Sequence, residues 1–275
     1  MPLFQNTLWR SVLSLSLLAT CLIGCAGDDN KDKLTEKPVE TLYEDGSKAF
    51  ADGDYKQSAK SFEEVERQYP YSQWATKAQL MAAYAQYEGR DYDSAIATVD
   101  RFIQLHPGNP EVAYAYYLRA ICFYERITDI TRDQSLTHEA ERALQDIVSR
   151  FPDSSYARDA EAKLSLVQDQ LAGAEMEVGR YYLKRQIFNA ALPRFQKVVA
   201  EFQTTSQVPE ALHRMVECYL ALGIKSEAQA TAAVLGHNFP GSDWYQKAYD
   251  LLGGEKLSPQ ADQSSWIGKF WRKLF

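Results

Sequence analysis

A spacing pattern that closes on a proline in four of its five copies, and on Gln203 in the other, constrains the fold of this chain more than any other feature. Each copy puts small or apolar residues at helical intervals on one face, and its terminator lies five residues after the last of them. Proline ends a helix because it has no N–H to donate. The copies are Tyr55, Ser58, Phe62, Val65 and Pro70; Tyr92, Ala95, Val99, Phe102 and Pro107; Ala140, Leu144, Ile147 and Pro152; Phe188, Ala191, Phe195, Val198 and Gln203; Ala228, Ala232, Leu235 and Pro240.

The first copy is preceded by a second small or apolar stripe, and the two stripes meet at Gly53. Two short helices joined by a tight turn are typical of the tetratricopeptide (TPR) repeat. One such unit cannot bury its apolar face alone, so neighbours are required. The pattern predicts an all-α, TPR-type helical solenoid of about five helix-turn-helix repeats.

Two insertions interrupt the regular spacing. Residues 128–135 lengthen the turn inside the third repeat, and we weigh a partner-contact loop against a simple spacer equally there. Residues 154–185 contain no proline and keep three-to-four spacing. They predict one long helix that joins two lobes, weakened at Gly173 and Gly179, where a kink could form.

These features divide the chain into five parts. Residues 1–24 read as a lipoprotein signal peptide and residues 25–38 as a polar, flexible tether. Residues 39–153 form the predicted N-terminal TPR lobe with repeats 1–3. Residues 154–252 form the C-terminal lobe with repeats 4 and 5 and the long connecting helix. Residues 253–275 are a linker and an amphipathic, aromatic and basic tail.

The amino terminus carries an apolar run that ends in Leu22-Ile23-Gly24-Cys25. The run is too short for a permanent membrane helix, and its end resembles the lipobox of bacterial lipoproteins. The resemblance implies that Cys25 is acylated, becomes the first residue of the mature protein and holds the chain to a membrane. The alternative is an ordinary cleaved signal peptide with an incidental cysteine. Ala26 in place of aspartate fits export to the outer membrane.

The tail has apolar and basic sides when it is drawn as a helix. Trp266, Ile267, Phe270, Trp271 and Leu274 lie on one side, opposite three basic residues. Such a helix suits a membrane surface or a groove on a partner protein. It could also fold back over the last repeat.

No catalytic constellation is present in the sequence. The four histidines are scattered, and phosphate-loop, serine-hydrolase and metal-binding motifs are missing. Cys122 and Cys218 have apolar neighbours, which favours two buried free thiols over a disulfide. The net charge of −7 argues against nucleic-acid binding. We therefore expect a binding protein with no catalytic residues, no metal site and no cofactor.

Several segments resemble the BamD (ComL) family of lipoproteins more closely than generic TPR repeats. The most specific is the run from Arg101 to Pro107, Arg-Phe-Ile-Gln-Leu-His-Pro. In the same order follow Asn109-Pro110, Tyr114, residues 116–119, Thr131-Arg132-Asp133-Gln134, residues 151–157 and residues 178–182. The likeness covers most of the chain from Cys25 to about Leu252, and the tail lies outside it.

The resemblance implies a non-enzymatic scaffold of the β-barrel assembly (BAM) complex, on the periplasmic face of the outer membrane and anchored at Cys25. Such proteins bind the POTRA region of the barrel protein BamA and organise accessory lipoproteins. They also assist folding and membrane insertion of unfolded outer-membrane β-barrel proteins.

Three residues are the candidate partner contacts. Arg194 matches the family arginine that faces BamA; without the resemblance it would read as a solvated helix charge. Pro193 beside it departs from the family pattern. Arg132 and Asp133, in the first insertion, are the other two candidates.

Two other functional classes compete with this reading. A periplasmic TPR adaptor linked to the Tol system or to cell-wall synthesis would lack the lipobox and would usually carry a coiled coil. A lipoprotein enzyme would show a convergent acid/base pair, and the sequence shows none.

Overall fold

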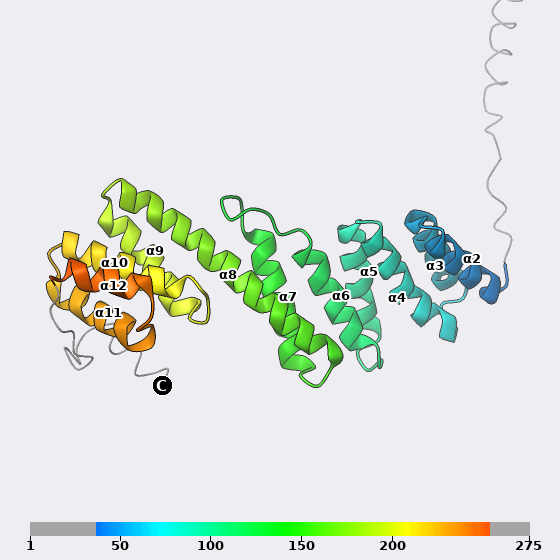
Figure 1. Ribbon diagram of the computed structural model, residues 1–275. Coiled ribbons are helices and arrows are strands. Elements are labelled where there is room, and N and C mark those ends of the chain that lie inside the picture. Colours follow the sequence, from blue (N-terminus) through cyan, green and yellow to red (C-terminus); the bar gives the residue numbers. More distant parts are fainter. Residues whose placement is uncertain (1–36, 254–275) are drawn as a thin grey trace, which may run out of the picture. The chain divides into compact units, whose positions relative to one another are not determined.

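The computed structural model describes residues 37–253. Within them the chain forms eleven helices and no strand, so the all-α prediction is confirmed. Their bounds are α2 (Val39–Ala51), α3 (Tyr55–Gln68), α4 (Gln73–Glu88), α5 (Tyr92–Leu105), α6 (Val112–Tyr124), α7 (Ser135–Arg150), α8 (Ser155–Lys184), α9 (Phe188–Glu201), α10 (Val208–Ala221), α11 (Lys225–Asn238) and α12 (Asp243–Leu251) (Figure 1).

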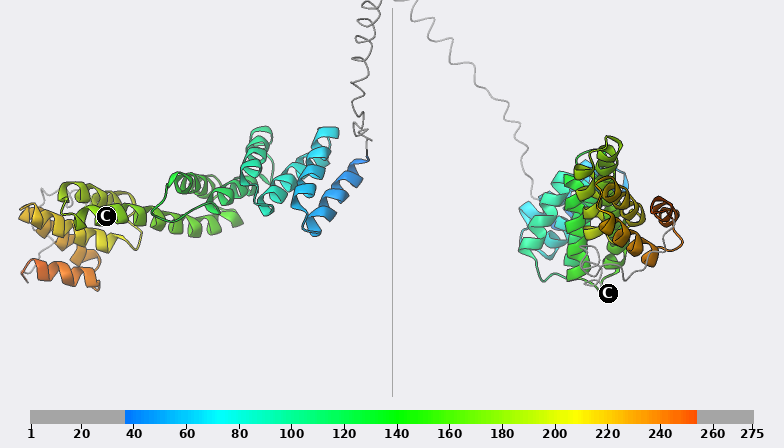
Figure 2. Two further views of the ribbon diagram at one scale, coloured as in Figure 1. Left: turned by 90° about the horizontal axis from the view of Figure 1, so that it is seen from above. Right: turned by 90° about the vertical axis from the view of Figure 1, so that its left-hand side faces the viewer.

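Each helix packs against the next one along the chain, which is the arrangement of a TPR-type solenoid. The pairs α2/α3, α4/α5, α6/α7, α8/α9 and α10/α11 are the five predicted repeats, and α12 packs on α10 and α11. Helix α8 is one continuous helix of 30 residues, as predicted (Figure 2). It contributes to the third and fourth pairs because it packs on α7 and on α9.

Gly179 serves close packing within this continuous helix. A Cβ atom there would lie 2.5 Å from Cε1 of Phe195 on α9, which is closer than carbon atoms can approach. The absent side chain therefore lets α9 press its aromatic residue against the backbone of α8. Gly46 does the same in the first repeat, since its Cβ would lie 2.9 Å from Cε1 of Phe62.

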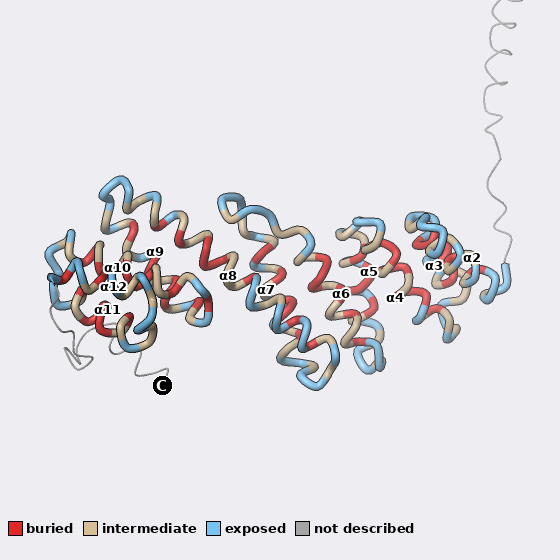
Figure 3. The backbone as a smooth tube through the Cα atoms, in the orientation of Figure 1, coloured by how far each residue is buried: buried red, intermediate tan, exposed pale blue. Residues whose placement is uncertain are grey.

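Buried residues line the contacts between successive helices (Figure 3). They fall into three clusters, of which two small ones join α2–α4 and α4–α6. The third and largest runs from Ala120 on α6 to Leu252 after α12. It includes residues from both sides of the predicted lobe boundary between residues 153 and 154, and that boundary stays a prediction.

Cys122 and Cys218 are buried free thiols, as predicted. Burial raises the pKa of each to about 12, so both are protonated at neutral pH. None of the helices between residues 37 and 253 is long and apolar enough to cross a membrane. The predicted signal peptide, the acylation site Cys25 and the tail lie outside the described residues.

Candidate partner-binding site

Arg194 lies on α9 in a small ionic cluster with α8. Its Nη1 donates to Oε2 of Glu175 at 3.0 Å, and Nζ of Lys197 donates to the other carboxylate oxygen at 2.7 Å. The Glu175 side chain is 15% exposed, whereas the Arg194 side chain is 45% exposed. The carboxylate is thus nearly enclosed while the guanidinium faces solvent. Because an arginine has five N–H donors, most of those on Arg194 stay available to a partner.

The protonation of Glu175 follows from its surroundings. Burial alone would raise its pKa, but the hydrogen bonds and charges of Lys197 and Arg194 outweigh burial and the net pKa lies below the usual value. Glu175 is therefore ionised at neutral pH and holds both cations in place. The cluster orients Arg194 without covering it.

Arg194 also lies one residue after the proline of α9. Pro193 falls inside the helix, which nevertheless continues from Phe188 to Glu201. A proline in a helix interior removes one backbone hydrogen bond. The ion pairs with Glu175 therefore hold this part of α9 to α8 where the backbone ladder is weakest.

The first insertion is an irregular loop between α6 and α7, over residues 125–134. It is tied to α8 at two points. Nε2 of Gln170 donates to the carbonyl oxygen of Thr128 at 2.8 Å, and Cγ2 of Ile130 lies 3.7 Å from where a Cβ on Gly173 would be. These contacts hold the loop against the middle of α8.

Arg132 and Asp133 have different roles within this loop. The Asp133 carboxylate accepts from the backbone N–H of Ser135 at 3.0 Å and from its hydroxyl, at the start of α7. Both hydrogen bonds go to Oδ1, and they lower the pKa of Asp133. The Arg132 side chain is exposed, and its charge is one of the causes that lower the pKa of Asp129 in the same loop. No ion pair of contact distance joins it to a described residue, so its guanidinium can reach a partner.

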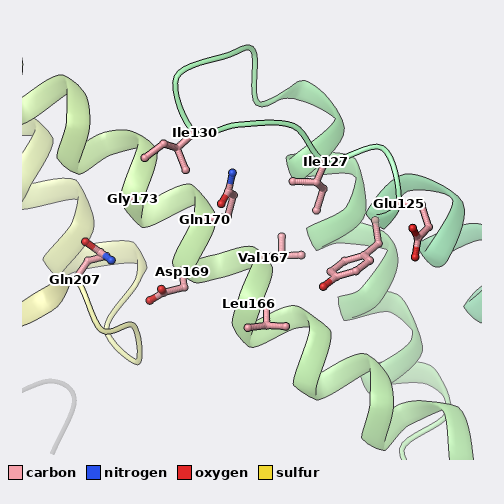
Figure 4. A pocket seen from close by; sticks show the side chains of 10 residues that line it. Glu125, Ile127, Ile130, Leu166, Val167, Asp169, Gln170, Gly173 and Gln207 are labelled. Carbon is pink, nitrogen blue, oxygen red and sulfur yellow. The ribbon is translucent and has the colours of Figure 1, made fainter.

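A groove of about 630 Å³ lies between this loop, α8 and the start of α10 (Figure 4). Ile127 and Ile130 of the loop and Leu166 of α8 line it, and Leu166 is 61% exposed. Polar groups at its rim include Gln170 and Asp169. The Asp169 carboxylate accepts from the N–H of Ser206 at 2.9 Å, which ties the start of the α10 segment to α8. The groove suits an apolar side chain of a bound segment.

The structure does not join the predicted contact residues into one site. The loop meets α8 at Gln170 and Gly173, whereas Arg194 meets it at Glu175. Two residues along a helix correspond to a rotation of roughly 200°. Gly173 and Glu175 therefore face nearly opposite sides of α8, and no hydrogen bond or ion pair among residues 37–253 links Arg194 to the loop.

Sequence reasoning missed Glu175, Lys197 and the groove. Arg194 and Lys197 lie three residues apart on one helix, so a shared acidic partner was detectable as a pattern. Which carboxylate serves as that partner depends on how α8 packs on α9. The groove had no detectable signal, since its walls come from three separated segments.

The described residues hold no group of three or more histidine, cysteine or acidic side chains arranged for a metal ion. His213 is buried, with its ring centroid 5.3 Å from that of Trp244 and Nε2 3.4 Å from the Glu217 carboxylate. His213 and Glu217 both lie on α10, so the ring contact with Trp244 is the one that joins α10 to α12.

Comparison with known proteins gives a consistent result. The family model YfiO, described as outer membrane lipoprotein, matches residues 35–235. A protein of Caulobacter vibrioides named outer membrane protein assembly factor BamD is 48% identical over 248 residues, which is 90% of this chain and 81% of the relative. A protein of Rickettsia prowazekii with the same name is 38% identical over 245 residues, 89% of this chain and 97% of the relative.

A solved structure from Thermus thermophilus, titled as a thermophilic TPR protein, is also similar. It is 17% identical to this chain, with a TM-score of 0.36, and the match covers 78% of this chain and 98% of that one. A likeness at this level carries no argument about function. The assignment of the TPR-type fold here rests on the helix pairs themselves.

Proposed function

Because this chain belongs to the YfiO family of outer membrane lipoproteins, we propose that it is an outer membrane protein assembly factor that works by binding other proteins. The proposal includes no catalytic step. The observation that carries it beyond family membership is the Arg194 cluster, in which an exposed guanidinium is held in place by an almost buried carboxylate.

We assign the main contact to the C-terminal repeats. Arg194 would pair with a carboxylate in the POTRA region of BamA, while Glu175 and Lys197 keep it in position. An arginine that is already oriented loses less side-chain entropy on binding than one free to rotate. The groove beside the loop, with Arg132 near it in sequence, is a second surface for the accessory lipoproteins or for segments of unfolded β-barrel proteins.

Localisation follows the same proposal. Cys25 would carry the acyl chains that hold the protein at the periplasmic face of the outer membrane, with residues 26–38 as a tether. Two or more acyl chains anchor a protein stably, because each buried methylene contributes about 0.8 kcal/mol.

The test is recovery of partners from solubilised membranes with the tagged, full-length protein. We expect mass spectrometry to find a barrel protein with POTRA domains in the eluate and a lipid-modified Cys25 in the bait. Arg194→Gln should lower recovery of the barrel protein at least tenfold, since losing one member of a desolvated charge pair costs about 2–5 kcal/mol.

Arg142→Gln is the matched control. Arg142 is an exposed arginine on α7 that pairs with Glu139 on its own helix. Its replacement should leave recovery unchanged. Eluates that contain Tol or cell-wall proteins instead of a barrel protein, or equal losses for both variants, would refute the proposal.

A further inference from the structure

The turns inside the fourth and fifth repeats lie on the same edge of the helix array. Helices α8 to α11 pack in chain order, and each tight turn reverses the chain direction. The end of α8, the start of α9, the end of α10 and the start of α11 therefore share one edge. We call residues 185–187 and 222–224 the inner turns of this edge.

These inner turns have the same backbone geometry as those of the first two repeats. The residue before the second helix has φ and ψ of −92° and 66° at Ile187 and of −94° and 69° at Ile224. The corresponding values are −85° and 71° at Asp54 and −87° and 69° at Asp91. The four positions are structurally equivalent, so any of them could hold a capping aspartate.

The side chains at these positions differ in kind. Asp54 accepts from the N–H of Gln57 at 3.0 Å, and Asp91 accepts from that of Ser94 at 3.3 Å. Ile187 and Ile224 form no such cap, and they are 46% and 41% exposed. An aliphatic residue here forgoes a stabilising cap and places apolar surface in solvent. No capping hydrogen bond accounts for that choice, and neither isoleucine belongs to the large buried cluster.

Two exposed cations lie beside Ile187. The chain has a net charge of −7, and three of the five lysines and arginines within residues 178–200, Arg180, Arg194 and Lys197, pair with glutamates outside that segment. Lys184 and Arg185, in and beside the first inner turn, form no ion pair with a described residue. Arg185 lies over the ring of Tyr181 at 4.4 Å, and that tyrosine is 49% exposed. Lys225 directly follows Ile224, and Glu227 lies two residues after Lys225.

We propose that this edge contacts an anionic phospholipid surface. Ile187 and Ile224 would enter the boundary between headgroups and acyl chains, Tyr181 would lie at headgroup level, and Lys184 and Arg185 would meet lipid phosphates. Aliphatic tips, an interfacial tyrosine and basic neighbours are the residue types that bind such surfaces.

The small size of the contact favours lipid over a protein partner. A stable protein interface buries about 1,200–2,000 Å² in total and has a packed centre. Two turn tips with one isoleucine each offer far less, and they belong to separate repeats. A fluid bilayer adapts to separated tips, and a lipoprotein already tethered to it needs only a weak second contact to fix its orientation. The inference does not depend on any protein partner of the proposed function.

Hydrogen–deuterium exchange on the membrane-purified protein tests the inference. The protein would be reconstituted into vesicles of phosphatidylethanolamine with phosphatidylglycerol and, separately, into vesicles of phosphatidylcholine alone. We expect amides of the inner turns to exchange at least about fivefold more slowly on the anionic vesicles, since one cation near such a surface contributes a factor of that order. Amides at Asp54 and Asp91 should exchange equally on both.

The double variant Ile187→Asp, Ile224→Asp should lose this protection. It should not unfold, because aspartate suits both cap positions, and an unchanged or higher Tm would verify that. Leu105→Asp is the control: Leu105 is 61% exposed at the end of α5, on the opposite edge of its own repeat, and its replacement should keep the protection.

Three results would overturn the inference. These are equal exchange on both lipids, protection that survives in the double variant, and protection that appears only when a purified protein partner is added. Since no partner is present in the primary experiment, its failure would leave the proposed assembly role untouched.

Discussion

The first two repeats and the last two are built on the same helix-turn-helix plan but are stabilised differently. In the first two, aspartates cap the second helices, and the buried residues form two small clusters. In the last two, isoleucines occupy the cap positions, and the buried residues belong to one cluster that extends from α6 to the end of α12. At the second helix of these repeats, a capping hydrogen bond is thus present where the shared core is small and absent where it is large.

The comparison suggests where surface residues are free to serve another purpose. A large continuous core contributes stability from many contacts, so the loss of about 1 kcal/mol at a cap is tolerable there. Among the described residues the first repeat has a neighbouring helix on one side only, whereas α12 packs on the outer side of the fifth repeat. The C-terminal repeats can therefore tolerate exposed isoleucines at the cap positions.

The largest expected effect comes from truncating one equivalent core residue in each region. Phe62 and Phe195 are both fully buried, and each packs on a glycine of the preceding helix. Replacing either by alanine should cost about 3–5 kcal/mol. Phe195→Ala should raise hydrogen exchange throughout α8–α12, whereas Phe62→Ala should raise it in α2–α4 only. If Phe62→Ala raised hydrogen exchange in α10 as much as Phe195→Ala does, the two cores would not be separate.

Replacing an ion-paired glutamate should cost less stability, and the cost should differ between the two regions. Interactions with Lys197 and Arg194 outweigh burial and lower the pKa of Glu175, and a side-chain hydrogen bond from Arg67 is the main cause that lowers the pKa of Glu64 to about 2. An acid with a lowered pKa stabilises the fold above its unfolded pKa, 4.5 for glutamate, and loses that effect as pH falls through the folded pKa.

Glu175→Gln should therefore cost roughly 1 kcal/mol near neutral pH, a cost that shrinks once the pH drops below the unfolded value. Glu64→Gln should cost almost nothing at any pH, despite the larger shift, because Arg67 is half exposed and solvent screens the pair. Urea midpoints of both variants and the parent, measured near neutral pH and in acid, give these differences. If Glu64→Gln cost more stability than Glu175→Gln, solvent exposure of the ion pair would not determine its contribution.

An exchange of caps should have an effect no larger than that of Glu175→Gln. Asp54→Ala and Asp91→Ala should each lower the free energy of unfolding by about 1 kcal/mol. Ile187→Asp and Ile224→Asp should each raise it by a similar amount, because the backbone angles match those of the aspartate caps. Thermal unfolding of the four single variants measures these changes. Destabilisation by the new aspartates would show that the isoleucines pack on something the turn geometry does not reveal.

Much of the fold was predictable because it depends on residues close together in the chain. The recurring spacing identified five helix pairs, and the long stretch without proline identified α8 as a single helix. The buried state of Cys122 and Cys218 followed from their apolar neighbours. The sequence predicted Gly179 only as a weak point of the helix. It did not show that glycine is needed there to make room for the Phe195 ring of another helix.

By itself, then, the amino-acid sequence determined the helices, their pairing and the family to which this chain belongs, because hydrophobic periodicity and turn residues act within a few positions of one another. Only the tertiary structure decided that Glu175 holds Arg194 and that the loop of Ile130 closes a groove on α8. It also decided that Ile187 and Ile224 face solvent on a shared edge. Those relations join residues on different helices, and the packing of whole helices determines which side chains meet.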